Sequence, residues 1–439
     1  MSGKFPGYRG EALKALEEVG AEIEDHIRVT KDGITYEGIL IPRSEHGDDK
    51  HLVLKVRSGY NIGVRITPTT KIEKIGPKTK LTFNPPLPPE QKKGLPKVAI
   101  LSTGGTIASR VDYRTGAVRP AISANDLYSI IPELSDIAVI DAEILFSLFS
   151  EDLTPENWTK IAESVTKRIR EGVDGVVITH GTDTMAYTAA ALSFALQNLP
   201  VPVMLVGAQR SEDRPSSDAA SNLIGAVLAA AKAPFAEVAV AMHETISDES
   251  IALHRGTKVR KCHTSRRDAF KSININPIAQ IKDGQITLLT DDYSKRDPNK
   301  EFILRPEFNR KVTLIKFYPG MDSEIIEWLI EKDYKGMVIE GTGLGHVSRR
   351  CFQSIQKAIK RNIIIAMTSQ CIWGRVNMNV YENGRDLLAM GVIPVGDMLP
   401  ETALVKLMWA LGQTDNTEEA ENLLKTNIAH EISERTVKM

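Results

Sequence analysis

Two short stretches of this chain place hydroxyl groups beside glycines, directly after runs of apolar residues. The first, residues 98–108, reads Val-Ala-Ile-Leu-Ser-Thr-Gly-Gly-Thr-Ile-Ala, and the second, residues 176–184, reads Val-Val-Ile-Thr-His-Gly-Thr-Asp-Thr. A continuous apolar run is typical of a strand buried on both faces. A glycine that follows such a strand lets a ligand approach the backbone closely. Each stretch therefore predicts a hydroxyl presented at the carboxyl end of a buried strand.

Neighbouring parallel strands deliver their carboxyl ends to the same edge of a sheet. Thr103 and the pair Thr182-Asp183 are therefore expected to face each other across one crevice. Each also has a plainer interpretation, because Thr103 could simply end a core strand and Thr182-Asp183 could cap the next helix. Two such strand ends on one sheet favour a site. Hydroxyls beside unshielded backbone N–H groups suit amide hydrolysis, which needs a nucleophile and donors for the tetrahedral oxyanion.

The bulk composition is that of an ordinary globular chain and weighs against several classes of function. The 439 residues are 42% hydrophobic and 25% charged, with a formal net charge of -1, so no global basic field attracts nucleic acid or membrane. The three cysteines lack the spacing of a disulfide framework or a metal site, and this fits a reducing cytosol. We expect a cytoplasmic protein with no secretion signal, no membrane span and no metal site.

The first part of the chain, residues 1–83, is predicted to form a small β-barrel unit that contacts a partner protein or tRNA. A short helix over residues 10–20 precedes several strand-like runs, and Asp32-Gly33 predicts a tight hairpin turn between two of them. Residues 84–96 contain five prolines, which favour an extended linker.

The rest of the chain alternates strands with helices, a pattern typical of parallel sheets covered by helices on both faces. We predict a large α/β unit over residues 97–290, which carries both glycine-hydroxyl stretches. It is expected to include a strand over residues 137–141 and a helix over residues 184–197, and the alternation breaks over residues 277–310. The polar, irregular residues 291–310 are predicted to link it to a small C-terminal α/β unit, residues 311–439, which ends in a charged tail.

Residues 103–107 and 180–184 together resemble the paired signature of the bacterial-type asparaginase family. The similarity extends over roughly residues 97–412, since residues 254–270 resemble the family's lysine segment and residues 150–155 its substrate-carboxylate loop. The resemblance implies a two-domain, asparaginase-like α/β fold with parallel sheets. It also implies homodimers, in which each active site is completed by a neighbouring subunit.

The resemblance assigns roles to individual residues of the signature. It implies that the Thr103 hydroxyl attacks the amide carbon of the substrate and forms an acyl-enzyme. Thr182, Asp183 and Lys261 form the second catalytic group, in which Asp183 orients Lys261 and also holds the substrate's α-ammonium. A neutral lysine can take a proton from threonine or water, and backbone N–H groups near Thr103 and Thr182 are the expected oxyanion donors.

The substrate contacts implied by the resemblance are Gly181, Ser150 and Glu151, together with Asp183. Glu151 stands where secreted members often carry glutamine, a difference that bears on the choice between asparagine and glutamine. The family also places a tyrosine on the loop after the first signature. Tyr113 is the candidate loop activator here, although an alignment without gaps puts Ala117 at that position.

The N-terminal unit and the linker are absent from a plain asparaginase, and they resemble one branch of the family, the D subunits of archaeal glutamyl-tRNA(Gln) amidotransferases. That branch implies ammonia release from glutamine or asparagine, which a partner, the E subunit, uses to convert Glu-tRNA(Gln) to Gln-tRNA(Gln). No cofactor is expected in this chain, and ATP and Mg are expected only in the partner's reaction. Two alternatives stay open: a free-standing cytosolic L-asparaginase and a non-catalytic binding scaffold.

Overall fold

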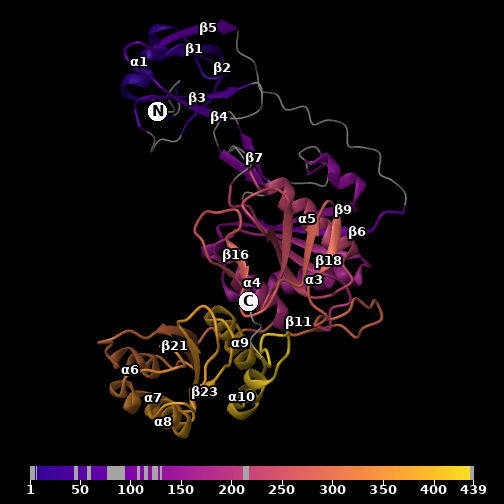
Figure 1. Ribbon diagram of the computed structural model, residues 1–439, viewed down its shortest axis with the longest axis vertical. Helices are drawn as coiled ribbons and strands as arrows, with labels where there is room; N and C mark the ends of the chain where they lie inside the picture. The colour runs from indigo at the N-terminus through magenta and orange to yellow at the C-terminus, as the bar shows by residue number, and fades with distance from the viewer. Residues whose placement is uncertain are drawn as a thin grey trace.

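The chain folds into three successive units, which a computed structural model describes for residues 5, 7–43, 48–56, 61–76, 94–105, 109–112, 117–120, 127–128, 131–210 and 217–435. Figure 1 shows the N-terminal unit in indigo, the large α/β unit in magenta and the small α/β unit in orange to yellow. Within these ranges, no helix is long and apolar enough to cross a bilayer.

The N-terminal unit is a five-stranded antiparallel sheet in the order β4-β3-β2-β1-β5, with one helix. Its elements are α1 (Gly10–Glu18), β1 (His26–Lys31), β2 (Ile34–Leu40), β3 (His51–Val56), β4 (Asn61–Arg65) and β5 (Lys71–Gly76). The predicted hairpin turn is present, since Asp32 and Gly33 both have positive φ and join β1 to β2. In the part that the structure describes, no ladder joins β4 to β5, so the sheet is open there rather than closed into a barrel.

The large unit is built on an eight-stranded sheet in the order β18-β17-β14-β13-β12-β10-β6-β9. The five strands from β13 to β9 are parallel, and β14, β17 and β18 extend them in antiparallel fashion. In chain order the strands are β6 (Lys97–Gly104), β9 (Val139–Leu148), β10 (Gly175–Thr179), β12 (Val203–Val206), β13 (Val238–His243), β14 (Ser250–Arg255), β17 (Ala279–Lys282) and β18 (Gln285–Leu288).

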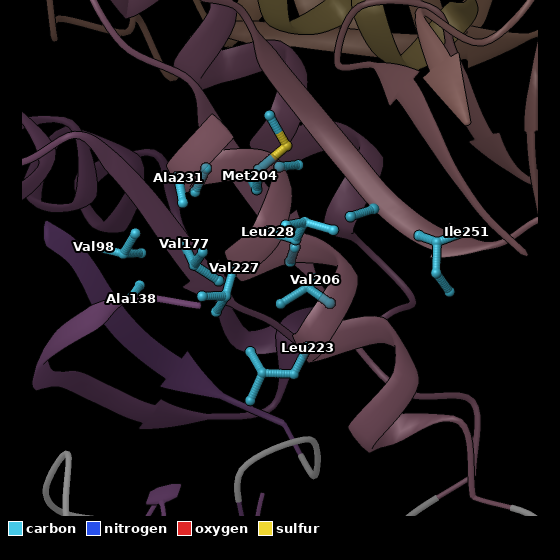
Figure 2. Close-up of a cluster of buried hydrophobic side chains, with 14 of the residues drawn as sticks. Val98, Ala138, Val177, Met204, Val206, Leu223, Val227, Leu228, Ala231 and Ile251 are labelled. Carbon is cyan, nitrogen blue, oxygen red and sulfur yellow. The ribbon is translucent and has the colours of Figure 1, made fainter. Parts of the chain in front are cut away.

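Helices cover both faces of this sheet, as the alternating pattern predicts. On one face, α5 (Ala219–Lys232) packs Leu223, Val227 and Leu228 against the central strands, and Figure 2 shows these side chains beside Val98 and Val177. On the other face lie α3 (Pro155–Arg170) and α4 (Met185–Ala195). Burial on both faces explains why the central strands are apolar throughout.

Shorter elements complete the large unit. They are the hairpin β7 (Ser109–Asp112) and β8 (Ala117–Pro120), the 3₁₀ turns η1 (Pro132–Asp136) and η2 (Ser150–Asp152), the hairpin β15 (Val259–Lys261) and β16 (Phe270–Ser272), and the pair β11 (Leu196–Gln197) and β19 (Ile303–Leu304).

Three details differ from the sequence expectations. The strand expected over residues 137–141 continues to Leu148, because β9 is an edge strand and its exposed positions hide the apolar signal. The helix expected to reach Gln197 ends at Ala195, where the chain pairs with β19 instead. The loss of βα rhythm after residue 277 reflects a change to antiparallel pairing within the same sheet.

The small unit has a four-stranded parallel sheet in the order β20-β21-β22-β23, covered on both faces. Its elements are β20 (Val312–Lys316), α6 (Glu324–Glu331), β21 (Gly336–Gly341), η3 (Arg349–Cys351), α7 (Phe352–Lys360), β22 (Ile364–Ser369), α8 (Glu382–Met390), β23 (Ile393–Pro394), α9 (Pro400–Gln413) and α10 (Thr417–Lys425).

Helix α9 joins the large and small units through a shared apolar core. Its Trp409 stacks on Phe194 of α4 with ring centroids 5.9 Å apart, and both side chains are fully buried. The same cluster includes Trp158 of α3 and Val338 of β21. Burial of aromatic side chains stabilises by about 1.5–3 kcal/mol each, so the two α/β units are held together by packing as well as by the chain.

We predict that Gly175→Ala lowers the free energy of unfolding by roughly 1–3 kcal/mol. Gly175 opens β10 where α5 crosses closely, and a Cβ there would overlap the Ala230 carbonyl. Chemical denaturation of the full chain measures the change. Gly63→Ala on β4 is the control, because the nearest heavy atom to its Cβ would be 4.0 Å away. Equal stability of both variants would contradict the close packing of α5 on β10.

Candidate active site

The two glycine-hydroxyl stretches lie side by side at the carboxyl edge of the large sheet. β6 and β10 are neighbouring parallel strands, and their register pairs Ser102 with Thr179. Thr103 follows directly, is 2% exposed, and donates its hydroxyl hydrogen to the Thr179 carbonyl over 2.9 Å. The structure thus places Thr103 against Thr179, within the second stretch.

Beyond the strands, the two stretches touch through their backbones. A Cβ on Gly105 would lie 3.0 Å from the Gly181 nitrogen, and a Cβ on Gly181 would lie 2.8 Å from the Cβ of Ser150. Thr184 donates its hydroxyl to the Ser150 carbonyl over 2.6 Å and holds η2 against this contact. Glycine is required because no side chain fits between these segments. Gly104 has a φ of +120° and its Cβ would overlap the Leu148 carbonyl, so the bend after Thr103 also needs glycine.

Lys261 lies on the hairpin formed by β15 and β16, and its side chain contacts Thr182 and Asp183 of the second stretch. Its ammonium donates to Thr182 Oγ1 over 2.9 Å and to Asp183 Oδ1 over 2.7 Å. The Lys261 side chain is 13% exposed whereas that of Asp183 is 71% exposed. Asp183 therefore has one oxygen on the lysine and a large open surface that can face a ligand. The geometry brings together all three residues predicted as the second catalytic group.

His180 supports the Gly181 turn through a buried chain of hydrogen bonds. Its Nδ1 lies 2.6 Å from the Gly181 carbonyl and its Nε2 lies 2.8 Å from Thr188 Oγ1. Thr188 in turn accepts from Trp158 Nε1 over 3.1 Å. A carbonyl only accepts, so Nδ1 carries the hydrogen and Nε2 accepts from Thr188.

Burial sets the charge of His180. Loss of hydration lowers its pKa to about 4, against the opposing bond to the Gly181 carbonyl. The ring is therefore neutral at pH 7 and matches the tautomer that its partners require. Thr188 and Trp158 were missed by sequence reasoning, because their link to the Gly181 turn depends on how α3 and α4 pack.

Two further residues, Glu151 and Tyr113, were also predicted for the site. The Glu151 side chain is exposed on η2, next to the buried Ser150. Tyr113 lies outside the described residues, and Ala117 begins β8, which pairs with β7 after the first stretch. In the described ranges, no group of three or more His, Cys, Asp or Glu side chains is arranged to hold a metal ion.

Three known families match three parts of the chain, and these parts correspond to the three units of the fold. The family described as "Asparaginase, N-terminal" matches residues 97–293, and "Glutaminase/Asparaginase C-terminal domain" matches residues 311–424. A third family, "GatD N-terminal domain", matches residues 21–75.

Solved asparaginases share the architecture of the two α/β units. The thermostable L-asparaginase from Thermococcus kodakarensis superimposes with a TM-score of 0.69 and 35% identity, over 77% of this chain and 100% of its own. L-asparaginase I from Vibrio cholerae gives a TM-score of 0.68 and 30% identity, over 77% and 99%. Fold and site thus define an asparaginase-like amidohydrolase domain, which confirms the predicted fold class.

Relatives that match almost the whole chain identify a narrower family within the asparaginase-like proteins. The D subunit of the glutamyl-tRNA(Gln) amidotransferase from Metallosphaera sedula is 50% identical over 98% of this chain and 97% of its own length. The corresponding D subunit from Pyrococcus furiosus is 52% identical over 96% and 97%. The chain belongs to the family of glutamyl-tRNA(Gln) amidotransferase D subunits, and the resemblance drawn from the paired signature is confirmed.

We predict that the stability of the chain falls as the pH drops from 6.5 toward 4. The unfolded chain titrates His180 near 6.5 and the folded chain near 4, so the unfolded state binds more protons throughout this window. The loss reaches roughly 3 kcal/mol for this one group at the acid end. Urea denaturation across the pH range measures it.

The variant His180→Asn tests the assignment, because it lacks the titrating ring and should show a shallower dependence of stability on pH. His263→Asn removes an exposed histidine and serves as the control. A slope in His180→Asn that equals that of the unaltered chain would show that another group is responsible.

Proposed function

We propose that this chain is the amidohydrolase component of a tRNA-dependent amidotransferase. It releases ammonia from glutamine or asparagine, and a partner subunit of the E type uses that ammonia to convert Glu-tRNA(Gln) to Gln-tRNA(Gln). The observation that carries the proposal is the Lys261–Thr182–Asp183 cluster, at the same sheet edge as the Thr103 strand end, in a chain that matches D subunits along its whole length.

The proposed chemistry begins with Thr103. Its Oγ1 attacks the side-chain amide carbon of the substrate, ammonia leaves, and water then hydrolyses the acyl-threonine. Lys261, in its neutral form, accepts the threonine proton through Thr182 and returns it to the leaving nitrogen, which departs as ammonia. Asp183 keeps the lysine in place while its exposed carboxylate holds the substrate's α-ammonium. Backbone N–H groups beside Gly104 and Gly181 stabilise the oxyanion, each worth about 3 kcal/mol of barrier.

The structure corresponds to a resting arrangement in this scheme. A hydroxyl has one hydrogen, and that of Thr103 is donated to the Thr179 carbonyl. The hydroxyl must turn away from that carbonyl before Lys261 can receive the proton. Thr182 is the alternative nucleophile, because it is already 2.9 Å from Lys261 Nζ.

Thr103→Ala is expected to reduce ammonia release by ~10³-fold or more, because no nucleophile remains at the strand end. Ser102→Ala removes a hydroxyl one residue earlier on β6 and should retain activity within about tenfold. Mass spectrometry of the protein quenched during turnover locates the acyl group. An adduct on Thr182, or turnover by folded Thr103→Ala, would assign the nucleophile to Thr182.

The remaining features of the proposal follow from the family. We propose a homodimer that assembles with the E subunit in the cytoplasm, where the complex handles aminoacylated tRNA. Substrate is held by Ser150, Gly181, Asp183 and Glu151, and Tyr113 assists the nucleophile from the loop that follows Asp112. The chain itself uses no cofactor, and ATP and Mg act in the partner's reaction.

Amide hydrolysis is expected to depend on the synthetic partner, because ammonia released into water serves no transfer reaction. We predict that the E subunit with Glu-tRNA(Gln) raises the glutaminase kcat/KM by ~5–150-fold, the range of a coupling energy of ~1–3 kcal/mol. Steady-state ammonia release is measured for the isolated chain, then with the partner, then with partner and Glu-tRNA(Gln). Equal rates in all three states would favour a free-standing asparaginase.

A further inference from the structure

The strand that carries Lys261 divides its side chains between two units of the molecule. In β15, Val259 is buried in the large-unit core and Lys261 reaches Thr182. Lys258 and Arg260 contact the small unit instead. Because successive side chains of a strand point to opposite faces, one face of this strand serves the site while the other faces the small unit.

The first of these contacts is a fully buried ion pair. Lys258 Nζ donates to Asp397 Oδ2 over 2.6 Å, and the two side chains are 0% and 1% exposed. Asp397 lies in the loop that leads into α9 of the small unit. Breaking such a pair leaves an uncompensated buried charge, so the backbone at Lys258 is strongly tied to this loop.

The second contact lies two residues further along. Arg260 Nε is 3.1 Å from Glu401 Oε1, and the side chains are 30% and 11% exposed. Glu401 stands in the first turn of α9, where the helix dipole favours a carboxylate. Its second oxygen, Oε2, is buried and has no hydrogen-bond partner among the described residues. Arg260 is therefore the ion-pair partner of this largely buried carboxylate.

The C-terminal segment, residues 427–435, closes around the same strand. Ser433 N donates to Asp397 Oδ1 over 2.9 Å, so Asp397 is held at once by Lys258, just before β15, and by this segment. Thr257, just before Lys258, donates its hydroxyl to the Ala429 carbonyl over 2.9 Å, and its own carbonyl accepts from the Thr402 hydroxyl over 2.8 Å. Thr257 and Lys258, which precede Lys261 in the chain, are thus hydrogen-bonded to three groups outside the large unit.

We propose that Lys258, Arg260, Asp397 and Glu401 are positioning residues, through which the small unit sets the place of Lys261 in the active site. Lys261 is only one residue beyond Arg260, so a shift of β15 moves its ammonium relative to Thr182 and Asp183. This inference rests on the proposed function of Lys261, which it extends to the small unit. It explains why Lys258 and Arg260, which are two residues apart, both pair with carboxylates of the small unit.

The test uses the full chain and the Arg260–Glu401 pair, which is partly exposed and therefore the safer one to alter. In Arg260→Gln and in Glu401→Gln, kcat for ammonia release should fall ~10- to 100-fold with KM within about twofold. Arg260→Lys should recover part of the loss. Arg310→Gln is the matched control, because Arg310 pairs with Glu156 at 3.2 Å, far along the chain from β15.

A double variant separates positioning from a general loss of stability. If Arg260 acts through Lys261, Lys261→Met/Arg260→Gln should be no slower than Lys261→Met alone. Additive losses in kcat would show that Arg260 acts independently of Lys261, and would overturn the proposal.

A second readout does not depend on turnover. Acetylation by N-hydroxysuccinimide acetate, followed by mass spectrometry of the peptide that contains Lys261, reports how tightly the amine is held. The rate should rise in Arg260→Gln and Glu401→Gln, as it should in Asp183→Asn, and stay unchanged in Arg310→Gln. Unchanged labelling in the first two variants would overturn the proposal. If the unaltered chain in its complex released no ammonia, the proposed function would be refuted. The acetylation rates would still show whether Arg260 and Glu401 hold Lys261 in place.

Discussion

The parallel pairing of β6 with β10 is the constraint on which the rest of the site depends. Its register sets Ser102 opposite Thr179, so the two chains leave the sheet side by side and Gly105 meets Gly181. The glycines are consequences of this pairing, since any side chain would force the two turns apart. Ser150 closes on Gly181 for the same reason. The residues of the candidate site are thus positioned by backbone contacts and not by side chains alone.

Much of this arrangement could be predicted because it is local in sequence. A buried apolar run followed by glycine and hydroxyls marks the end of a strand whether or not its neighbours are known. The position of Thr103 and of Thr182-Asp183 at one sheet edge follows from the rule for parallel strands. The edge strand β9 was predicted too short because its side chains alternate between partial burial and exposure, which leaves no continuous apolar signal.

The groups that support the site were not predictable, because each depends on a distant partner. His180 is held at Nε2 by Thr188, which in turn accepts from Trp158, and these two residues lie on different helices. Lys258 and Asp397 are separated by 139 residues, and neither has a local pattern that distinguishes it from a surface charge. Lys261 itself is identified by the family's lysine segment rather than by periodicity. Sequence patterns indicate which strand ends present hydroxyls beside glycines. The partners that fix these residues in space depend on how the helices and the small unit pack.

The Thr103 hydroxyl has its hydrogen committed to a backbone acceptor in this structure. Its hydrogen bond to the Thr179 carbonyl contributes only about 1 kcal/mol net. A competing acceptor or a bound substrate therefore needs to supply little free energy to turn the hydroxyl away from that carbonyl. The surrounding backbone is far harder to move, because Gly105 and Gly181 are in contact and Lys261 is held by two acceptors. In the proposed scheme, rotation of the Thr103 hydroxyl is consequently a less costly change than any shift of the surrounding backbone.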